Sequence, residues 1–420
     1  MNVGYFGGTF DPIHNGHLHM LDAATKVFAL DLVIVMPAGM PYHKDLLAVS
    51  PACFRYMMCR RALSRRPEVV LSAAEIRRRG PSYTIDTVHD LKRDFLPGDR
   101  FYLICGSDIL DTIQHWYHFE ELLTELVLAV AIRPGENRSR LEQRAQELQR
   151  RYGAEVILYD TPMLPVSSTA IRQQIEESRG RSPADLPPGV MRIIRRYGLY
   201  REPNPMVWLQ PETRRQVVEL ESKLFDLISL KRLAHSVSTM FEAIRLAKRF
   251  GGDVNRAAIA ALLHDFAKEL TVSEMRALAP ALESDPRDSN ATLHGPAAGQ
   301  LLESVFGIND PEIADAITWH TTLREGATML DKIIFLADKI EPSRTFGDLG
   351  PIREKAERDL DEAVLATLEG VRQHLIREKL KVHPASLAAM GELMRERPDA
   401  SGKGSRKIKI KVKKKRKKDD

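Results

Sequence analysis

The amino-acid sequence predicts two folded domains of different class, an α/β domain built on a parallel sheet and then an all-α domain, followed by a disordered basic tail. The chain has 420 residues, which is more than one domain usually contains. Short apolar runs alternate with helical patterns up to about residue 200, and long amphipathic patterns follow a proline-containing segment. We expect an α/β domain at 1–200, a linker at 201–213, an all-α domain at 214–395 and the tail at 396–420.

The composition indicates a globular protein without a membrane span. Hydrophobic residues make up 43% and charged residues 28% of the chain, which is enough apolar material for sizeable cores. No run approaches the roughly 18 apolar residues of a membrane-spanning helix, and the N-terminus begins with an apparent strand instead of a signal segment. The three cysteines include no CxxC pair, which fits a reducing compartment. We therefore expect a cytoplasmic protein.

The basic character of the chain is concentrated at its end. Residues 401–420 hold 11 Lys and Arg against 2 Asp, so the remainder has 51 basic and 55 acidic residues. This mildly acidic remainder does not support a general nucleic-acid surface. We expect the tail to be a solvated extension, and the alternative is a weak contact with RNA or another anionic surface.

Six short apolar runs predict the strands of the first domain. They are rich in β-branched residues and separated by helix-length spacers, which favours parallel strands with helices on both faces of the sheet. The expected strands span residues 3–6, 32–36, 69–72, 101–105, 126–132 and 155–159. In the second domain, residues 216–229 and 236–250 have the clearest amphipathic helical patterns.

Unusual polar motifs follow five of these strands. Each motif alone is often only a turn or a helix cap. The carboxyl ends of parallel strands, however, border one crevice in which nucleotides bind, so we expect the motifs to converge there. The motifs span residues 7–17, 41–44, 106–108, 133–135 and 166–172.

The first motif suits phosphate binding and phosphoryl transfer. Gly7, Gly8 and Thr9 allow backbone N–H groups to approach a phosphate, and the helix that follows adds partial positive charge at its N-terminus. His14 and His17, three residues apart, can present two imidazole donors to a phosphoryl group that gathers charge in the transition state. No covalent step is required.

Two further motifs supply donors and positive charge. Ser167, Ser168 and Thr169 immediately precede a helical pattern, so their hydroxyl and N–H groups can hold a leaving pyrophosphate. Arg172 can reach the same group as a cation, and Lys44 can add a charge from the opposite side.

The string GGTFDPIHNGH at 7–17 resembles the (H/T)xGH nucleotidyltransferase superfamily, which has a Rossmann-like fold. Together with PYHK at 41–44, YTIDT at 83–87, GSD at 106–108, Trp116, RPG at 133–135, SSTAIR at 167–172 and a closing RRYGLY, it is similar to the bacterial nicotinate-nucleotide adenylyltransferases. The resemblance covers about residues 1–200. It implies transfer of the adenylyl group of ATP to nicotinate mononucleotide with Mg²⁺, giving nicotinate adenine dinucleotide and pyrophosphate.

The same resemblance implies roles for individual residues. His14 and His17 would contact the ATP phosphates, while Lys44 and Arg172 would hold the triphosphate. Thr84 and Trp116 would face the nicotinate, and Arg133 is a further substrate-binding residue. The residues implied for ATP binding are Gly7, Gly8, Thr9, Phe10, Gly106, Asp108, Ser167, Ser168 and Thr169, with Asp108 near the ribose. One departure is Ser107, because the family often has alanine there.

Metal-ligand residues are scattered over the helical patterns of the second domain. Imidazole and carboxylate ligands without thiolates suit Fe, Mn or Zn better than a structural zinc site. A carboxylate such as Asp265 can bridge two ions that activate water and bind phosphate oxygens, which indicates phosphoester or phosphoanhydride hydrolysis. A single histidine in a helix often has only a packing role, but the adjacent pair His264-Asp265 followed by Lys268 is harder to explain in that way. The candidate ligands are His235, His264, Asp265, His294, His320 and Asp338.

The second domain resembles the HD hydrolase superfamily, and within it the YqeK-type hydrolases that cleave diadenosine tetraphosphate symmetrically to two ADP. The matching strings are RLAHS (232–236), ALLHDFAKEL (261–270), LHGPAAG (293–299), WHTT (319–322) and LDKIIFLADKIEPSR (330–344). The resemblance implies a di-metal centre of iron or, alternatively, manganese. His235, His264, Asp265 and Asp338 would surround one ion, and His294 and His320 would share Asp265 around the other.

Lys268 and Arg344 would then neutralise substrate phosphates. Alternative interpretations retain the HD domain but change its role. In these interpretations, the HD domain acts on a guanosine alarmone, a cyclic dinucleotide or a nucleoside triphosphate, or it is a nucleotide sensor without turnover. Enzymes that act on cyclic dinucleotides often carry a GYP extension, and none follows His264-Asp265. Homo-oligomer formation is compatible with either interpretation.

Overall fold

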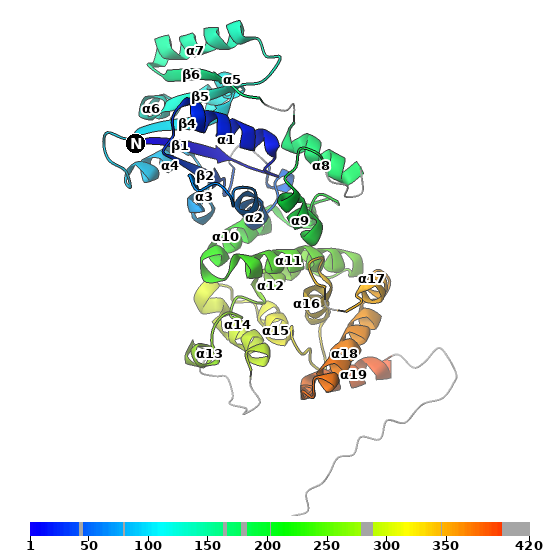
Figure 1. Cartoon of the computed structure of the whole chain (residues 1–420). Helices are drawn as coiled ribbons and strands as arrows, with labels where there is room; N and C mark the ends of the chain where they lie inside the picture. Colours follow the sequence, from blue (N-terminus) through cyan, green and yellow to red (C-terminus); the bar gives the residue numbers. More distant parts are fainter. Residues whose placement is uncertain are drawn as a thin grey trace, which may run out of the picture.

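A computed structural model describes residues 1–41, 45–78, 80–162, 166–177, 183–201, 203–278, 289–345 and 347–396. Lys44 of the predicted triphosphate site lies outside these residues. So does the expected tail, except for Glu396 at the end of the last helix. The described residues form a sheet domain followed by a helical domain, which confirms the predicted fold class (Figure 1).

The sheet has six parallel strands in the order β3-β2-β1-β4-β5-β6. Successive strands are added towards one edge of the sheet from β1 to β3 and towards the other edge from β4 to β6. The boundary between β1 and β4 is therefore the switch point, where doubly wound sheets bind nucleotides. All six predicted strands are present, with ends that differ by at most two residues. They span β1 (Asn2–Gly8), β2 (Leu32–Pro37), β3 (Val69–Leu71), β4 (Arg100–Gly106), β5 (Val127–Ile132) and β6 (Glu155–Asp160).

Helices cover both faces of the sheet, because alternate strand residues enter different cores. On β2, Val33 and Val35 belong to one buried cluster, whereas Ile34 and Met36 belong to the other. The helices of this domain are α1 (Asn15–Val27), α2 (Ala52–Ala62), α3 (Ala74–Arg77), α4 (Thr84–Lys92), α5 (Ile109–Thr112), α6 (Phe119–Glu125), α7 (Arg138–Tyr152), α8 (Ser168–Glu177) and α9 (Pro188–Tyr197), with 3₁₀ turns η1 (Leu46–Ala48) and η2 (Ile113–His115).

The second domain is helical throughout its described residues. Its elements are η3 (Pro205–Trp208), α10 (Pro211–Leu227), α11 (Leu230–Phe250), α12 (Val254–Leu263), α13 (Val272–Leu278), α14 (Asn290–Phe306), α15 (Pro311–Trp319), α16 (Met329–Ile340), α17 (Gly350–Ala356), α18 (Leu360–Arg377) and α19 (Pro384–Glu396). None of the described helices has both the length and the apolar character needed to cross a bilayer.

The segment expected as a linker is largely structured. It contains η3 and the first turn of α10. Helix α10 begins with Pro211, and the first N–H of a helix has no partner within the helix, so the N–H that proline lacks costs nothing there. Met206 and Leu209 are buried. The segment therefore packs between the domains.

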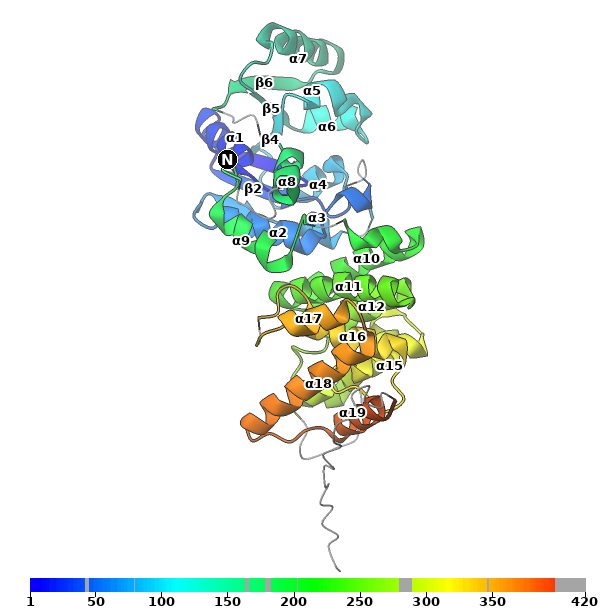
Figure 2. The ribbon, with the colours of Figure 1, turned by 90° about the vertical axis from the view of Figure 1, so that its right-hand side faces the viewer.

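The two domains share one continuous buried apolar cluster. Helices α10 and α11 lie between the sheet domain and the remaining helices in both views (Figures 1 and 2). The ring of Phe225 on α10 lies 5.2 Å from that of Tyr56 on α2, and Arg77 pairs with Asp226 at 2.5 Å. The helical domain therefore covers one face of the sheet domain.

Glu221 of α10 caps a helix of the other domain. Helix α2 follows Pro51, which offers no capping side chain, and the Cys53 N–H donates instead to Glu221 Oε1 at 2.8 Å. Both groups are buried. The Glu221→Ala variant is expected to lose about 1–3 kcal/mol of unfolding free energy, because a buried N–H loses its acceptor. Urea unfolding measures this loss, with the exposed neighbour Glu219→Ala as control. Equal stability of the two variants would contradict the capping role.

Candidate active sites

The loop after β1 passes very close to neighbouring side chains, which explains its two glycines. A Cβ at Gly7 would lie 2.6 Å from the Tyr5 hydroxyl, and one at Gly8 would lie 3.0 Å from the ring of Phe10. Phe10 itself has a positive φ of 51°. The loop thus turns sharply into α1 at the switch point of the sheet.

His14 and His17 stand together at the N-terminus of α1. His14 is the N-cap, and its backbone N–H donates to His17 Nδ1 at 3.2 Å. The two ring centroids are 3.8 Å apart. This N-terminus favours anions through the helix dipole. Because Nδ1 of His17 accepts this bond, the neutral ring carries its proton on Nε2 and can donate it.

Burial, and then the charge of Arg133, lowers the pKa of His14 from 6.5 to about 4. His14 is therefore neutral at pH 7 and stabilises the fold above pH 6.5, and this contribution is lost as pH falls towards 4. Between pH 7 and 4, the wild-type chain is expected to lose about 3 kcal/mol more unfolding free energy than His14→Asn, which retains an N-cap. Urea unfolding at both pH values measures this difference, and parallel losses in the two proteins would refute it.

The predicted SSTAIR segment lies against the loop before α1. Ser168 Oγ donates to the Pro12 carbonyl at 3.0 Å, and Arg172 donates to the Asp11 carbonyl at 2.8 Å. Ser167 Oγ accepts from the Ala170 N–H at 3.1 Å, so it caps the first turn of α8. Segments more than 150 residues apart in sequence therefore meet at one sheet edge.

Other predicted residues occupy the neighbouring strand ends. A Cβ at Gly106, where β4 ends, would lie 2.6 Å from Asp108 Oδ1, and Arg133 after β5 pairs with that oxygen at 3.4 Å. Thr84 begins α4, and Trp116 follows η2. The residues next to these two, Tyr83 and Tyr117, stack with centroids 4.4 Å apart. The structure thus brings the segments of Thr84 and Trp116 together.

One contact of this site was not predicted. The Tyr200 hydroxyl donates to Asp11 Oδ1 at 2.5 Å, and the Ser50 N–H donates to Oδ2 at 2.9 Å. Asp11 is buried, so these bonds fix the loop that leads to His14. The sequence signal was the closing RRYGLY string, to which no role was assigned.

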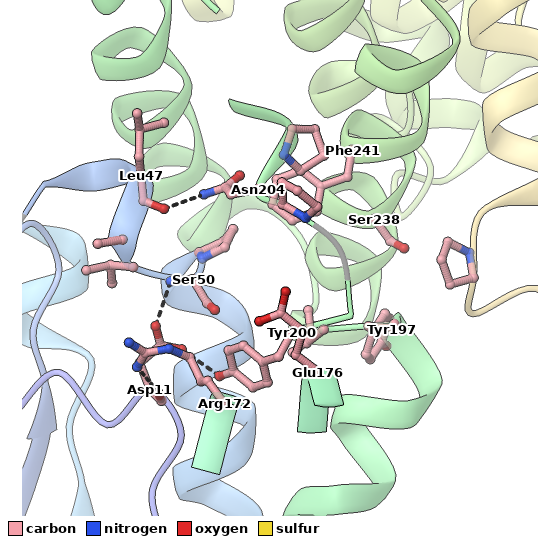
Figure 3. A pocket seen from close by; sticks show the side chains of 18 of the residues that line it. Asp11, Leu47, Ser50, Arg172, Glu176, Tyr197, Tyr200, Asn204, Ser238 and Phe241 are labelled. Atoms are coloured by element: carbon pink, nitrogen blue, oxygen red, sulfur yellow. Dashed lines mark hydrogen bonds between the residues drawn. The ribbon is translucent and has the colours of Figure 1, made fainter. Parts of the chain in front are cut away.

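A cavity of about 300 Å³ lies beside this contact, at the junction of the two domains. Figure 3 shows Asp11, Arg172 and Tyr200 on its sheet-domain side, and Ser238 and Phe241 of α11 on the other. Its walls therefore include residues adjoining both candidate active sites.

The second site gathers the six predicted ligands from five helical segments. His235 lies on α11, His294 on α14 and Asp338 on α16, while His264 and His320 are the C-cap residues that directly follow α12 and α15. Asp265 directly follows His264. All six side chains are buried, and they form three overlapping groups of potential metal ligands.

Asp265 lies in the middle of the cluster. Its Oδ1 is 3.1 Å from His294 Nε2 and 3.5 Å from His320 Nε2, whereas its Oδ2 is 3.9 Å from His235 Nε2 and 3.7 Å from His264 Nε2. One carboxylate oxygen thus faces each pair of imidazoles. This is the arrangement that a bridging carboxylate requires.

The protonation states of Asp265, His294 and His320 suit metal ligands. Burial alone would raise the pKa of Asp265, but the charge of His264 and hydrogen bonds from His294 and His320 hold it well below its usual value. Burial lowers the pKa of His320 to about 3 and also lowers that of His294. The carboxylate is therefore charged and these two imidazoles are neutral, as metal ligation requires.

The donor set fits one or two divalent cations. The buried His264 Nε2 has no hydrogen-bond partner among the described residues, although it points at Asp265 and Asp338 at 3.7 and 3.6 Å. A buried, unsatisfied ring nitrogen facing two carboxylates is what an ion would complete. Imidazole and carboxylate donors do not distinguish iron from manganese.

Four cations among the described residues adjoin the cluster, and the sequence analysis identified two of them. Lys268 Nζ lies 3.0 Å from His294 Nδ1, and Arg344 pairs with Asp338. The missed ones are Arg232, which pairs with Asp265 at 2.6 Å, and Lys339, which pairs with Asp338 at 2.5 Å. Their positions in the sequence could have identified them, because Arg232 precedes His235 by one helical turn and Lys339 adjoins Asp338.

Both domains match known protein families. Residues 5–174 match the cytidylyltransferase-like family, and residues 232–343 match the HD domain. A probable nicotinate-nucleotide adenylyltransferase of Clostridium tetani is 35% identical over 197 residues, which are 47% of this chain and 97% of that protein. The protein of the same description from Moorella thermoacetica is 40% identical over 199 residues, covering 47% and 91%.

A solved structure is similar to the second half. It is described as a predicted HD superfamily hydrolase involved in NAD metabolism from Clostridium acetobutylicum, with 32% identity and a TM-score of 0.41, and the match covers 42% of this chain and 96% of that one. The fold and the family match define the first half as a nucleotidyltransferase domain. More specifically, the chain belongs to the nicotinate-nucleotide adenylyltransferase family, and it also carries an HD domain.

Proposed function

We propose that the chain is a bifunctional enzyme, with an adenylyltransferase at 1–200 and a hydrolase at 214–395. The first activity transfers the adenylyl group of ATP to nicotinate mononucleotide, a step of NAD biosynthesis, with Mg²⁺. The observation that carries it is the contact of Ser168 and Arg172 with the Asp11–Pro12 loop, which leads directly into the His14–His17 turn at the switch point of the sheet.

In this proposal the described residues act by positioning and by donating hydrogen bonds. His17 donates from Nε2 to a phosphate at the N-terminus of α1, and Arg172, which donates to the Asp11 carbonyl, faces the same phosphates as a cation. Asp108 and Arg133 border the adenosine side, and Thr84 and Trp116 the nicotinate side. Lys44 retains its predicted triphosphate role as part of the proposal.

The second proposed activity is symmetrical hydrolysis of diadenosine tetraphosphate to two ADP at a di-metal centre. The observation that carries it is Asp265, whose two oxygens face two different pairs of histidines. Iron or manganese bound here would polarise phosphate oxygens and activate water. Lys268 and Arg344 would bind the phosphates of the substrate, as would Arg232 and Lys339.

Product analysis with the full chain tests both activities. With ATP, Mg²⁺ and nicotinate mononucleotide, the expected products are nicotinate adenine dinucleotide and pyrophosphate. Faster turnover of nicotinamide mononucleotide would contradict the acceptor assignment.

For the hydrolase, the full chain is purified without oxygen, loaded with Fe²⁺ or Mn²⁺ and given diadenosine tetraphosphate. ADP as the sole product supports the proposal. ATP plus AMP would retain a hydrolase but refute symmetrical cleavage. No turnover with metal bound would favour another nucleotide substrate or a sensing role.

The cytoplasm is the compartment we propose, since all three cysteines are free thiols.

A further inference from the structure

A buried carboxylate behind the metal-ligand cluster was absent from the predicted site. Glu341 directly follows α16, three residues after Asp338, and its side chain is fully buried. Its Oε2 accepts from Ser238 Oγ and from the Ser343 N–H, both at 2.7 Å, and its Oε1 accepts from Ser343 Oγ at 2.6 Å. These three hydrogen bonds therefore hold the carboxylate in place independently of any contact with the metal-ligand cluster.

The same Oε1 lies 3.1 Å from His235 Nδ1. His235 Nε2 points the other way, into the cluster, at 3.0 Å from Asp338 Oδ1. Since Glu341 as a carboxylate is only an acceptor, Nδ1 carries a proton and donates it to Glu341, which leaves Nε2 as the only ring nitrogen that a metal ion could use. Glu341 thus fixes the tautomer that metal ligation at Nε2 requires.

The other three histidines are oriented differently. Their Nδ1 atoms contact backbone carbonyl oxygens one helical turn earlier, at 2.6 Å for His264, 2.7 Å for His294 and 2.6 Å for His320. A carboxylate is a stronger acceptor than a carbonyl and makes the imidazole a better electron donor. Among the four described cluster histidines, His235 is thus the one whose Nδ1 contacts a carboxylate.

We propose that Glu341 is a positioning residue that sets metal affinity at the His235 side of the centre and leaves the His294–His320 side unchanged. This inference rests on the proposed di-metal centre. The two metal positions are consequently unequal, because only one has an imidazole backed by a carboxylate. Glu341 touches neither the substrate nor the ions; it acts through the ring of His235.

The test compares two conservative variants of the full chain. Glu341→Gln keeps the size of the side chain but removes its charge. Glu221→Gln makes the same change at a buried, hydrogen-bonded glutamate that caps α2 and contacts none of the six ligands. Mn²⁺ binding is measured by equilibrium dialysis with metal analysis, together with the unfolding free energy.

Wild type and Glu221→Gln are expected to bind two ions alike. Glu341→Gln is expected to bind one of them about 10–100-fold more weakly and the other unchanged. Ser238→Ala, which frees Glu341 on one side, should weaken the same ion by a smaller factor, and it replaces Glu341→Gln if that variant does not fold. The smaller effect is also a readout that a purely structural role would not produce.

Three results would overturn the inference: unchanged binding in Glu341→Gln, equal weakening of both ions, or the same loss in Glu221→Gln. Failure of the wild-type chain to bind any Mn²⁺ is a different result, because it would remove the di-metal centre itself. The two proposals are therefore separable in one experiment.

Discussion

Replacing Asp265 with alanine is expected to lower the rate of ADP release from diadenosine tetraphosphate by on the order of 10³-fold or more, with the transferase rate unchanged. Asp265 is the one side chain shared by both halves of the cluster, since its oxygens face His294 and His320 on one side and His235 and His264 on the other. Its loss would leave four imidazoles without the carboxylate between them. Chromatography of the products and metal analysis of the purified protein measure both consequences.

A matched control separates this effect from general damage to the domain. Asp331 is also a buried carboxylate of the helical domain, paired with Arg324 at 3.0 Å, and it lies outside the cluster. Asp331→Asn is expected to cost stability while retaining metal and hydrolysis. If Asp265→Ala kept its metal and its rate, the central position assigned to this carboxylate would be wrong.

Replacing His17 with alanine is expected to lower the rate of nicotinate adenine dinucleotide formation by about 10²–10³-fold, with the hydrolase rate unchanged. The backbone N–H of His14 holds His17 Nδ1, so the ring donates from Nε2 at the N-terminus of α1. In the proposed transferase site, that donor faces the phosphates, where negative charge grows during transfer. Rates are measured with saturating ATP and nicotinate mononucleotide.

His19 provides the control, because it lies on the same helix two residues further on and belongs to none of the predicted motifs. His19→Ala is expected to retain the transferase rate within about twofold. A comparable loss in both variants would show that the helix, and not the His17 donor, is responsible.

The sheet and the metal-ligand cluster were predictable because local patterns specify them. Runs of β-branched residues identified all six strands, and the HD pair with its companion histidines identified residues that the structure gathers into one cluster of potential ligands. Helix starts were less accurate. Helix α11 begins at Leu230, where Ser229 Oγ caps the Arg232 N–H, whereas the predicted pattern began at 236.

The residues that sequence analysis missed act across long distances in the chain. Glu341 resembles any charged residue at a helix end, and its burial arises only when α11 packs against α16. Glu221 is part of an amphipathic pattern, and its partner is the N-terminus of a helix 168 residues away. Tyr200 meets Asp11 across 189 residues. Such pairings depend on tertiary packing, which periodicity does not encode.

The shared apolar cluster has a consequence for synthesis on the ribosome. The sheet domain emerges before α10 and α11 exist, so the face of α2 that later meets Phe225 is exposed for the few seconds needed to translate about 50 residues. The nascent first half must remain soluble during that interval. The order of the two domains in the gene therefore determines which apolar face stays exposed until its partner helices are synthesised. The completed chain buries this face.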